Sequence, residues 1–253
     1  LVGGGSSGLG RACAARLAAE GCRVAIWSRD RAAIESTADD LRAAHGVEVH
    51  PIAADARDAG AAIAVTEAAA SALGPIDIVV LNAGGPPTVD ATATTPDGWH
   101  EAFQLLAITP IEMATLLLPS MRARRWGRIV AILSSGVRQP IHELVYSNAG
   151  RSALMAWLKT CSRSVIADGV TMNGVLPGRL DTPRVAALDR ERAERTRQPI
   201  EAVTAERLTS IPAGRYGDPD ELAALVAYLC SDPARYQTGT FVAVDGGMID
   251  SLA

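Results

Sequence analysis

The sequence predicts a doubly wound α/β fold, in which a parallel sheet of about seven strands is covered by helices on both faces. Three observations support this prediction. A glycine-rich turn opens the chain, short apolar runs alternate with longer helical stretches, and nearly half of the 253 residues are apolar with few aromatics. Strands that are apolar on both faces and joined by helices are typical of a buried parallel sheet. A single domain over residues 1–253 fits this length.

Each expected element follows from an apolar run or a helical stretch, in chain order. The first strand is truncated, because the sequence starts without methionine inside an apolar run, so further residues are expected before Leu1. The expected strands are Leu1–Val2, Cys22–Trp27, Glu48–Ala53, Ile76–Leu81, Arg128–Leu133, Val170–Leu176 and Thr240–Val244. Stretches of helical length and composition lie at Arg11–Glu20, Arg31–His45, Ala59–Leu73, Asp97–Arg124, Glu143–Asp168 and Pro219–Cys230.

Residues 183–212 interrupt this alternation. The segment is charged, rich in Arg and Glu, and lies between two expected strands. It is typical either of helical segments that form a lid over a substrate or of a solvated excursion, and we expect the lid.

The bulk properties exclude several classes of function. A net charge of −4 gives no basis for nucleic-acid binding, and no apolar run reaches the roughly 18 residues of a membrane span. Four scattered cysteines, without C-x-x-C, indicate reduced thiols in the cytoplasm and no metal site. Of the 24 basic residues only Lys159 is a lysine.

The turn from Gly3 to Gly10 predicts a phosphate site. Glycines let the backbone approach a pyrophosphate, and the N–H groups and dipole of the following helix favour its negative charge. The next strand ends in Ser28 and Arg29, where a carboxylate would instead hold the ribose 2′-hydroxyl of NAD. A hydroxyl and a guanidinium suit a 2′-phosphate, so the sequence favours NADP(H) over NAD(H). The alternative is a surface arginine beside Asp30.

Further motifs occur at the ends of the later strands. They are Asn82-Ala83-Gly84, Ser134-Ser135 with Tyr146 a dozen residues on, Pro177-Gly178, Asp181-Thr182 and Val244-Asp245-Gly246-Gly247. With the glycine turn, they resemble the short-chain dehydrogenase/reductase family, most closely its 3-oxoacyl-carrier-protein-reductase-like members with an imperfect catalytic tetrad. The resemblance covers essentially the whole chain and implies a Rossmann-type fold and a nicotinamide cofactor.

The resemblance also implies where the cofactor binds. The contacts would come from the glycine turn, the ends of the next three strands and the loop after the sixth strand. These residues are Gly4, Ser6, Ser7, Gly8, Leu9, Ser28, Arg29, Asp55, Ala56, Asn82, Ala83, Gly84, Pro177, Gly178 and Thr182.

The catalytic groups of the family match this chain only in part. In the family a tyrosine exchanges a proton with the carbonyl, a lysine four residues later assists it, a serine orients the substrate and an asparagine supports a water relay. Ser134 matches the serine, with one residue fewer than usual before Tyr146, which matches the tyrosine. The lysine position is Gly150 and the asparagine position is Leu106, so two groups are missing.

No neighbouring cation is expected to replace the lysine. On a helix Arg151 is turned about 140° from the tyrosine, which predicts that it faces packing or solvent. Lys159 lies about 20 Å along the same helix, at roughly 1.5 Å per residue, and cannot reach.

Two functions remain open. The first is NADP(H)-dependent reduction of a small carbonyl substrate, a 3-oxoacyl thioester or another ketone, with Tyr146 as acid, Ser134 as orienting group and slow turnover. The second is a non-catalytic NADP(H)-binding sensor or assembly subunit. We expect the enzyme, because a binding module has no need of both side chains.

The resemblance further implies a homo-oligomer, a tetramer or dimer, formed through the helices expected at 97–124 and 143–168. The apolar residues Leu144, Leu154, Trp157 and Leu158 are compatible with such an interface, although burial in the core explains them equally well.

Overall fold

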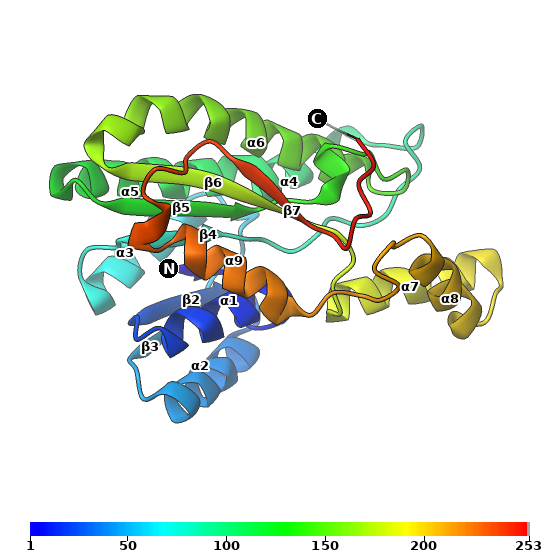
Figure 1. Ribbon diagram of the computed structural model, residues 1–253, viewed down its shortest axis with the longest axis horizontal. Coiled ribbons are helices and arrows are strands. Elements are labelled where there is room, and N and C mark those ends of the chain that lie inside the picture. The colour runs from blue at the N-terminus through cyan, green and yellow to red at the C-terminus, as the bar shows by residue number, and fades with distance from the viewer. Residues whose placement is uncertain (252–253) are drawn as a thin grey trace.

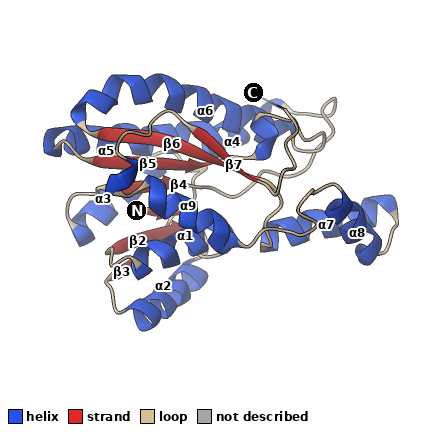
Figure 2. Cartoon of the chain, in the orientation of Figure 1, coloured by secondary structure: helices blue, strands red, loops and turns tan. Residues whose placement is uncertain are grey.

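Seven parallel strands form a single sheet in the computed structural model, which describes residues 1–251 (Figures 1 and 2). The strand order is β3-β2-β1-β4-β5-β6-β7. The strands are β1 Val2–Gly3, β2 Val24–Ser28, β3 Val49–Ala53, β4 Ile78–Leu81, β5 Gly127–Ile132, β6 Val170–Pro177 and β7 Phe241–Val244. The predicted fold class is confirmed, and every predicted strand is present with its ends shifted by at most two residues.

Helices cover both faces of the sheet. On one face, buried residues of α1 Gly8–Ala19, α2 Arg31–His45 and α9 Pro219–Leu229 pack together. On the other face lie α3 Ala61–Leu73, α5 Thr109–Arg124 and α6 Val145–Val165. Successive side chains of β5 point to opposite faces of the sheet and so contribute to both core layers. Ile129 and Ala131 lie in the layer under α3, α5 and α6, and Val130 lies in the layer under α1, α2 and α9.

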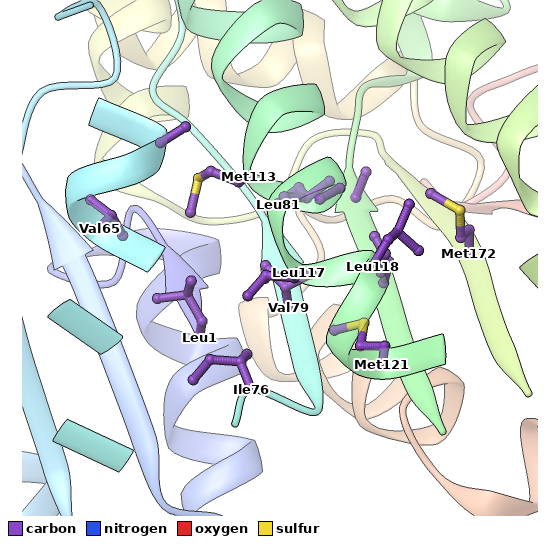
Figure 3. Close-up of a cluster of buried hydrophobic side chains, with 14 of the residues drawn as sticks. Leu1, Val65, Ile76, Val79, Leu81, Met113, Leu117, Leu118, Met121 and Met172 are labelled. Carbon is purple, nitrogen blue, oxygen red and sulfur yellow. The ribbon is translucent and has the colours of Figure 1, made fainter. Parts of the chain in front are cut away.

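The core on the α3–α5–α6 face is aliphatic and methionine-rich (Figure 3). Leu117, Leu118 and Met121 of α5 pack against Val79 of β4 and the neighbouring strands. Aliphatic side chains of this size fill such a layer without polar atoms that would need partners. The scarcity of aromatic residues therefore does not prevent a buried core.

The helix predicted at Asp97–Arg124 is one continuous helical run with a change of winding. It comprises α4 Pro96–Phe103, a π-helical segment Gln104–Ile108, and α5. By length and composition alone, the 29-residue run Pro96–Arg124 could cross a membrane. Here it is a core helix, since Met113, Leu117 and Met121 are buried against the sheet.

The charged segment is helical, as α7 Pro183–Thr196 and α8 Ile200–Thr209, and extends to one side of the sheet (Figure 1). For two of the four apolar residues considered for an interface, the structure favours the alternative of core burial. Leu154 and Leu158 belong to the core, whereas Trp157 is only partly buried.

From β3 the chain crosses to β4, which pairs with β1 on the side away from β2, so the strand order reverses between β1 and β4. In open parallel sheets, ligands bind beyond the carboxyl ends of the strands at this point. The topology therefore sets the place in which a functional site is expected.

Candidate functional site

A cleft of about 1240 Å³ lies at the carboxyl ends of the strands. Its lining includes the turn after β1, the ends of β2 to β6, and residues of α4, α6, α7 and α8. All fifteen residues predicted to contact the cofactor line this cleft, together with Ser134 and Tyr146. The structure thus brings the predicted site residues together, while their roles stay predictions.

The turn between β1 and α1 depends on glycine for space and conformation. A Cβ at Gly10 would lie 2.2 Å from the carbonyl oxygen of Gly4, far inside contact distance. Gly8 has a φ of 51°, which side chains rarely adopt. Ser7 precedes the helix without a side-chain capping bond, so the first N–H groups of α1 keep their capacity to bind an anion. The turn therefore fits a pyrophosphate.

Asn82 joins this turn to the next strand. Its Nδ2 donates to the carbonyl oxygen of Gly3 at 3.0 Å, which ties the end of β4 to the end of β1. The amide therefore shapes the floor of the cleft from the centre of the sheet.

The ends of β2 and β3 form the other end of the cleft. Arg29 is exposed there, and among residues 1–251 no carboxylate lies within 4.0 Å of its guanidinium. Asp55 instead pairs with Arg57, whose Nη2 lies 2.6 Å from the carboxylate. The hydrogen bonds from Arg57 lower the pKa of Asp55. Sequence reasoning missed this arginine, although its place two residues after Asp55 in a turn permits the contact.

Ser134 and Tyr146 both line the cleft. Ser134 follows β5, and its Oγ accepts a hydrogen bond from the Gly136 N–H at 3.0 Å. Tyr146 exposes only 4% of its surface and its phenol oxygen accepts from the Thr95 N–H at 2.9 Å. Its ring packs edge-on against Trp99, with centroids 4.7 Å apart. The phenol is therefore held at the start of α4.

The expectation that Arg151 faces packing or solvent is wrong. Arg151 lines the cleft, and its guanidinium donates to the carbonyl oxygen of Ile132 at 2.7 Å and of Ala83 at 3.4 Å. Its Nε donates to Ser147 Oγ at 3.3 Å, from one turn further along α6. Burial lowers the pKa of Arg151 to about 10, with a smaller contribution from the charge of Arg184, so it stays protonated at neutral pH.

The number of residues between Ser134 and the start of α6 accounts for the orientation of Arg151 into the cleft. Tyr146 comes one residue early for the family pattern, whereas Ser147 has the usual separation from Ser134, and Arg151 lies four residues after Ser147. A difference of one residue turns a helical side chain by about 100°. The direction of the family's lysine on α6 therefore falls on Arg151, and that of its tyrosine on Ser147. Tyr146 is turned from that direction by about 100° and lines the cleft with its phenol bonded to Thr95, directly before α4.

Gly150, the predicted lysine position, does not line the cleft. A Cβ there would lie 3.0 Å from Leu106 Cβ and 3.4 Å from the Ala102 carbonyl oxygen. Gly150 lets α6 approach the helix that carries Leu106, which is itself buried.

Replacing Gly150 with lysine is therefore expected to leave turnover no faster and to destabilise the fold by about 1–3 kcal/mol through overpacking. Thermal denaturation and NADPH oxidation measure the two effects. Thr160→Lys, at an exposed position of the same helix, is the matched control. A faster, equally stable Gly150→Lys protein would restore the original assignment.

The segment 183–212 contributes to the wall of the cleft through both of its helices. Asp189, which exposes 3% of its surface, anchors it: Arg179 Nη1 lies 3.0 Å away and the Tyr216 hydroxyl donates at 2.7 Å. Burial and this carboxylate raise the pKa of Tyr216 to about 12. Arg179 is thus engaged by Asp189.

The loop after β6 meets the phosphate turn. Thr182 accepts a hydrogen bond from the Val185 N–H at 3.3 Å and so caps α7. A Cβ added at Gly8 would lie 3.5 Å from the Thr182 Cβ, so the loop and the turn are neighbours. His142 and Arg138 do not line the cleft, and Arg138 donates to the Phe241 carbonyl oxygen. Across residues 1–251, no group of three His, Cys, Asp or Glu is placed to hold a metal ion.

A protein-family model described as enoyl-(acyl carrier protein) reductase matches residues 4–249. The chain belongs to the short-chain dehydrogenase/reductase family. Members of this family are oxidoreductases that use NAD(P).

Relatives of known activity match over nearly their full length. Acetoacetyl-CoA reductase of Shinella zoogloeoides is 32% identical, over 98% of this chain and 96% of its own. The 3-oxoacyl-(acyl-carrier-protein) reductase of Aquifex aeolicus is 28% identical over the same shares. L-sorbose reductase of Gluconobacter frateurii, solved with NADPH and L-sorbose, superposes with a TM-score of 0.94, 30% identity, and coverage of 99% and 96%.

Proposed function

We propose that this protein is an NADP(H)-dependent oxidoreductase that reduces a carbonyl to an alcohol. The observation that carries the proposal is the single cleft that joins the phosphate turn and Arg29 at one end to Ser134, Tyr146 and Arg151 at the other. Similarity to acetoacetyl-CoA and 3-oxoacyl reductases supports a ketone or 3-oxoacyl thioester as the substrate.

The residues of the cleft fit a dinucleotide with a 2′-phosphate. The turn at Gly8 and the uncapped start of α1 suit the pyrophosphate, and the exposed guanidinium of Arg29 suits the extra phosphate. Bound NADPH would supply a hydride to the carbonyl carbon.

The chain's own groups would orient the carbonyl and move the proton. The Ser134 hydroxyl would donate a hydrogen bond to the carbonyl oxygen and so hold the substrate. Tyr146, the one tyrosine among the described residues lining the cleft, would give that oxygen its proton. The Thr95 N–H, already bonded to the phenol oxygen at 2.9 Å, would stabilise the negative charge left on it.

An oligomer and a cytoplasmic location belong to the same proposal. Leu116 of α5 exposes 46% of its surface, and Ile108, the residue directly before α5, exposes 42%. This helical run therefore offers apolar surface to a second copy of the chain.

Steady-state oxidation of NADPH tests the function. The substrates are short 3-oxoacyl thioesters and a panel of simple ketones, with NADH as the competing cofactor. We expect measurable turnover of at least one carbonyl and a preference for NADPH. Tight NADPH binding without turnover of any of them would instead support the non-catalytic binding protein.

A further inference from the structure

The cleft is lined by eight arginines, although the whole chain has a net charge of −4. Five carboxylates line it as well, and Asp189 and Glu206, which are not part of the lining, pair with three of the arginines. Five of these arginines have a carboxylate within 4.0 Å: Arg57, Arg179, Arg192, Arg195 and Arg207. Within the described chain, the other three, Arg29, Arg151 and Arg184, have none. Arg29 lies at the end of β2, where the proposed 2′-phosphate would neutralise its charge. Arg151 and Arg184 then remain without an anionic partner among the described residues.

Arg151 is the better ordered of these two cations. Its three hydrogen bonds, to two strand-end carbonyls and to Ser147, use one N–H on each guanidinium nitrogen. One further N–H on each terminal nitrogen therefore remains for a ligand, which suits the two oxygens of a carboxylate. Ile132, whose carbonyl oxygen it binds, is two residues before Ser134 in the chain. Arg151 and Ser134 line the same cleft.

Arg184 approaches from the opposite wall. It lies in the first turn of α7, and its Nη2 donates to the Pro86 carbonyl oxygen at 2.7 Å in the loop after β4. Its guanidinium packs so closely on Gly85 that a Cβ there would lie 2.9 Å from Nε. The charge is near enough to Arg151 to lower the pKa of that residue further. Two like charges held together in a cleft are costly unless an anion lies between them.

We propose that the substrate is an oxo acid, whose carboxylate is bound by Arg151 and Arg184 while its carbonyl faces Ser134. This inference rests on the proposed function and narrows its substrate class. The cofactor's own pyrophosphate is the competing anion. It belongs at the turn around Gly8, whereas Arg151 bonds to the carbonyl oxygens of Ile132 and Ala83, and Arg184 to that of Pro86. Ala83 is also a predicted cofactor contact, so the test below measures the Kd of NADPH beside the selectivity for the acid.

The test compares an acid with its neutral ester. It measures kcat/KM for 2-oxobutanoate and 3-oxobutanoate and for their methyl esters, and in parallel the Kd of NADPH by fluorescence titration. In the wild-type protein we expect one acid to exceed its ester about tenfold or more. Arg184→Met is expected to lower that ratio about ten- to a hundredfold, as for loss of a charge-assisted bond, with the Kd of NADPH changed less than threefold.

Three further variants define the site. Arg151→Met is expected to lower the ratio similarly, and Arg151→Lys to retain most of it because the charge remains. Arg151→Met also removes the donor from two partly buried carbonyl oxygens and can impair folding, so the decision rests on Arg184→Met. Arg190→Met removes a charge from an exposed position of α7 outside the cleft and is expected to leave the ratio unchanged.

Equal rates for acid and ester in the wild type would overturn the inference and leave the proposed function standing. So would an Arg184→Met protein that binds NADPH much more weakly with an unchanged ratio, since the anion would then be the pyrophosphate. If no carbonyl is turned over, the proposed function fails. Calorimetric binding of the oxo acids to the NADP⁺-loaded protein then decides the anion site: binding lost in Arg184→Met supports it, and no binding overturns it.

Discussion

Replacement of Tyr146 by phenylalanine is expected to lower kcat/KM for carbonyl reduction by about 10²–10⁴-fold, the usual contribution of a general acid. The change removes the only tyrosine hydroxyl among the described residues that line the cleft, together with the oxygen that accepts from Thr95. Steady-state rates at saturating NADPH measure the loss. The Kd of NADPH is expected to stay within a few fold, because Tyr146 is not one of the predicted cofactor contacts.

Tyr228→Phe is the matched control, since it removes the same atom from a tyrosine of α9 outside the cleft. Thermal denaturation should accompany both variants, because loss of the Thr95 bond alone costs about 1 kcal/mol. A Tyr146→Phe protein with wild-type turnover would show that the phenol serves only to pack against Trp99. The proton would then have to come from elsewhere, with Ser147 beside Arg151 as the group to test next.

Arg29→Asp is expected to raise the Kd of NADPH about a hundredfold or more and to leave that of NADH little changed. The substitution removes a bidentate phosphate partner and places a carboxylate where it repels a 2′-phosphate but can accept from a ribose hydroxyl. Fluorescence titration of both cofactors measures the effect. Because Arg29 is exposed and no carboxylate within the described residues pairs with it, stability should hardly change.

Arg31→Asp provides the control for net charge. Arg31 is exposed at the start of α2, outside the cleft, and is two residues from Arg29. Its replacement makes the same change in charge and is expected to leave the preference for NADPH intact. Parallel weakening of both cofactors in Arg29→Asp would contradict a 2′-phosphate contact and indicate a general effect of charge.

The fold was predictable because its signals are repetitive. Apolar runs such as that of β6, joined by helices, define a parallel sheet without any contact being known. The glycine turn was predictable for a similar reason, since Gly8 and Gly10 satisfy requirements of backbone conformation and approach that few sequences allow. Such local requirements determine which residue type occurs at a position, so they can be recognised from the sequence alone.

The reacting end was harder to predict because it depends on rotation about a helix. Anchoring the pattern on Tyr146 placed Arg151 on the wrong face, and one residue of shift restores it to the cleft. The partners of Arg151 are carbonyls from two distant strands, and those of Asp189 come from two loops. Contacts between segments far apart in the chain, to backbone atoms that every residue carries, leave no mark in a single sequence.

A crystal structure of the protein with NADPH at millimolar concentration tests the central claim most directly. We expect the pyrophosphate at the start of α1, the 2′-phosphate against Arg29, and the nicotinamide beside Ser134, Tyr146 and Arg151. A cleft without the dinucleotide, or a nicotinamide directed away from these three side chains, would contradict the account.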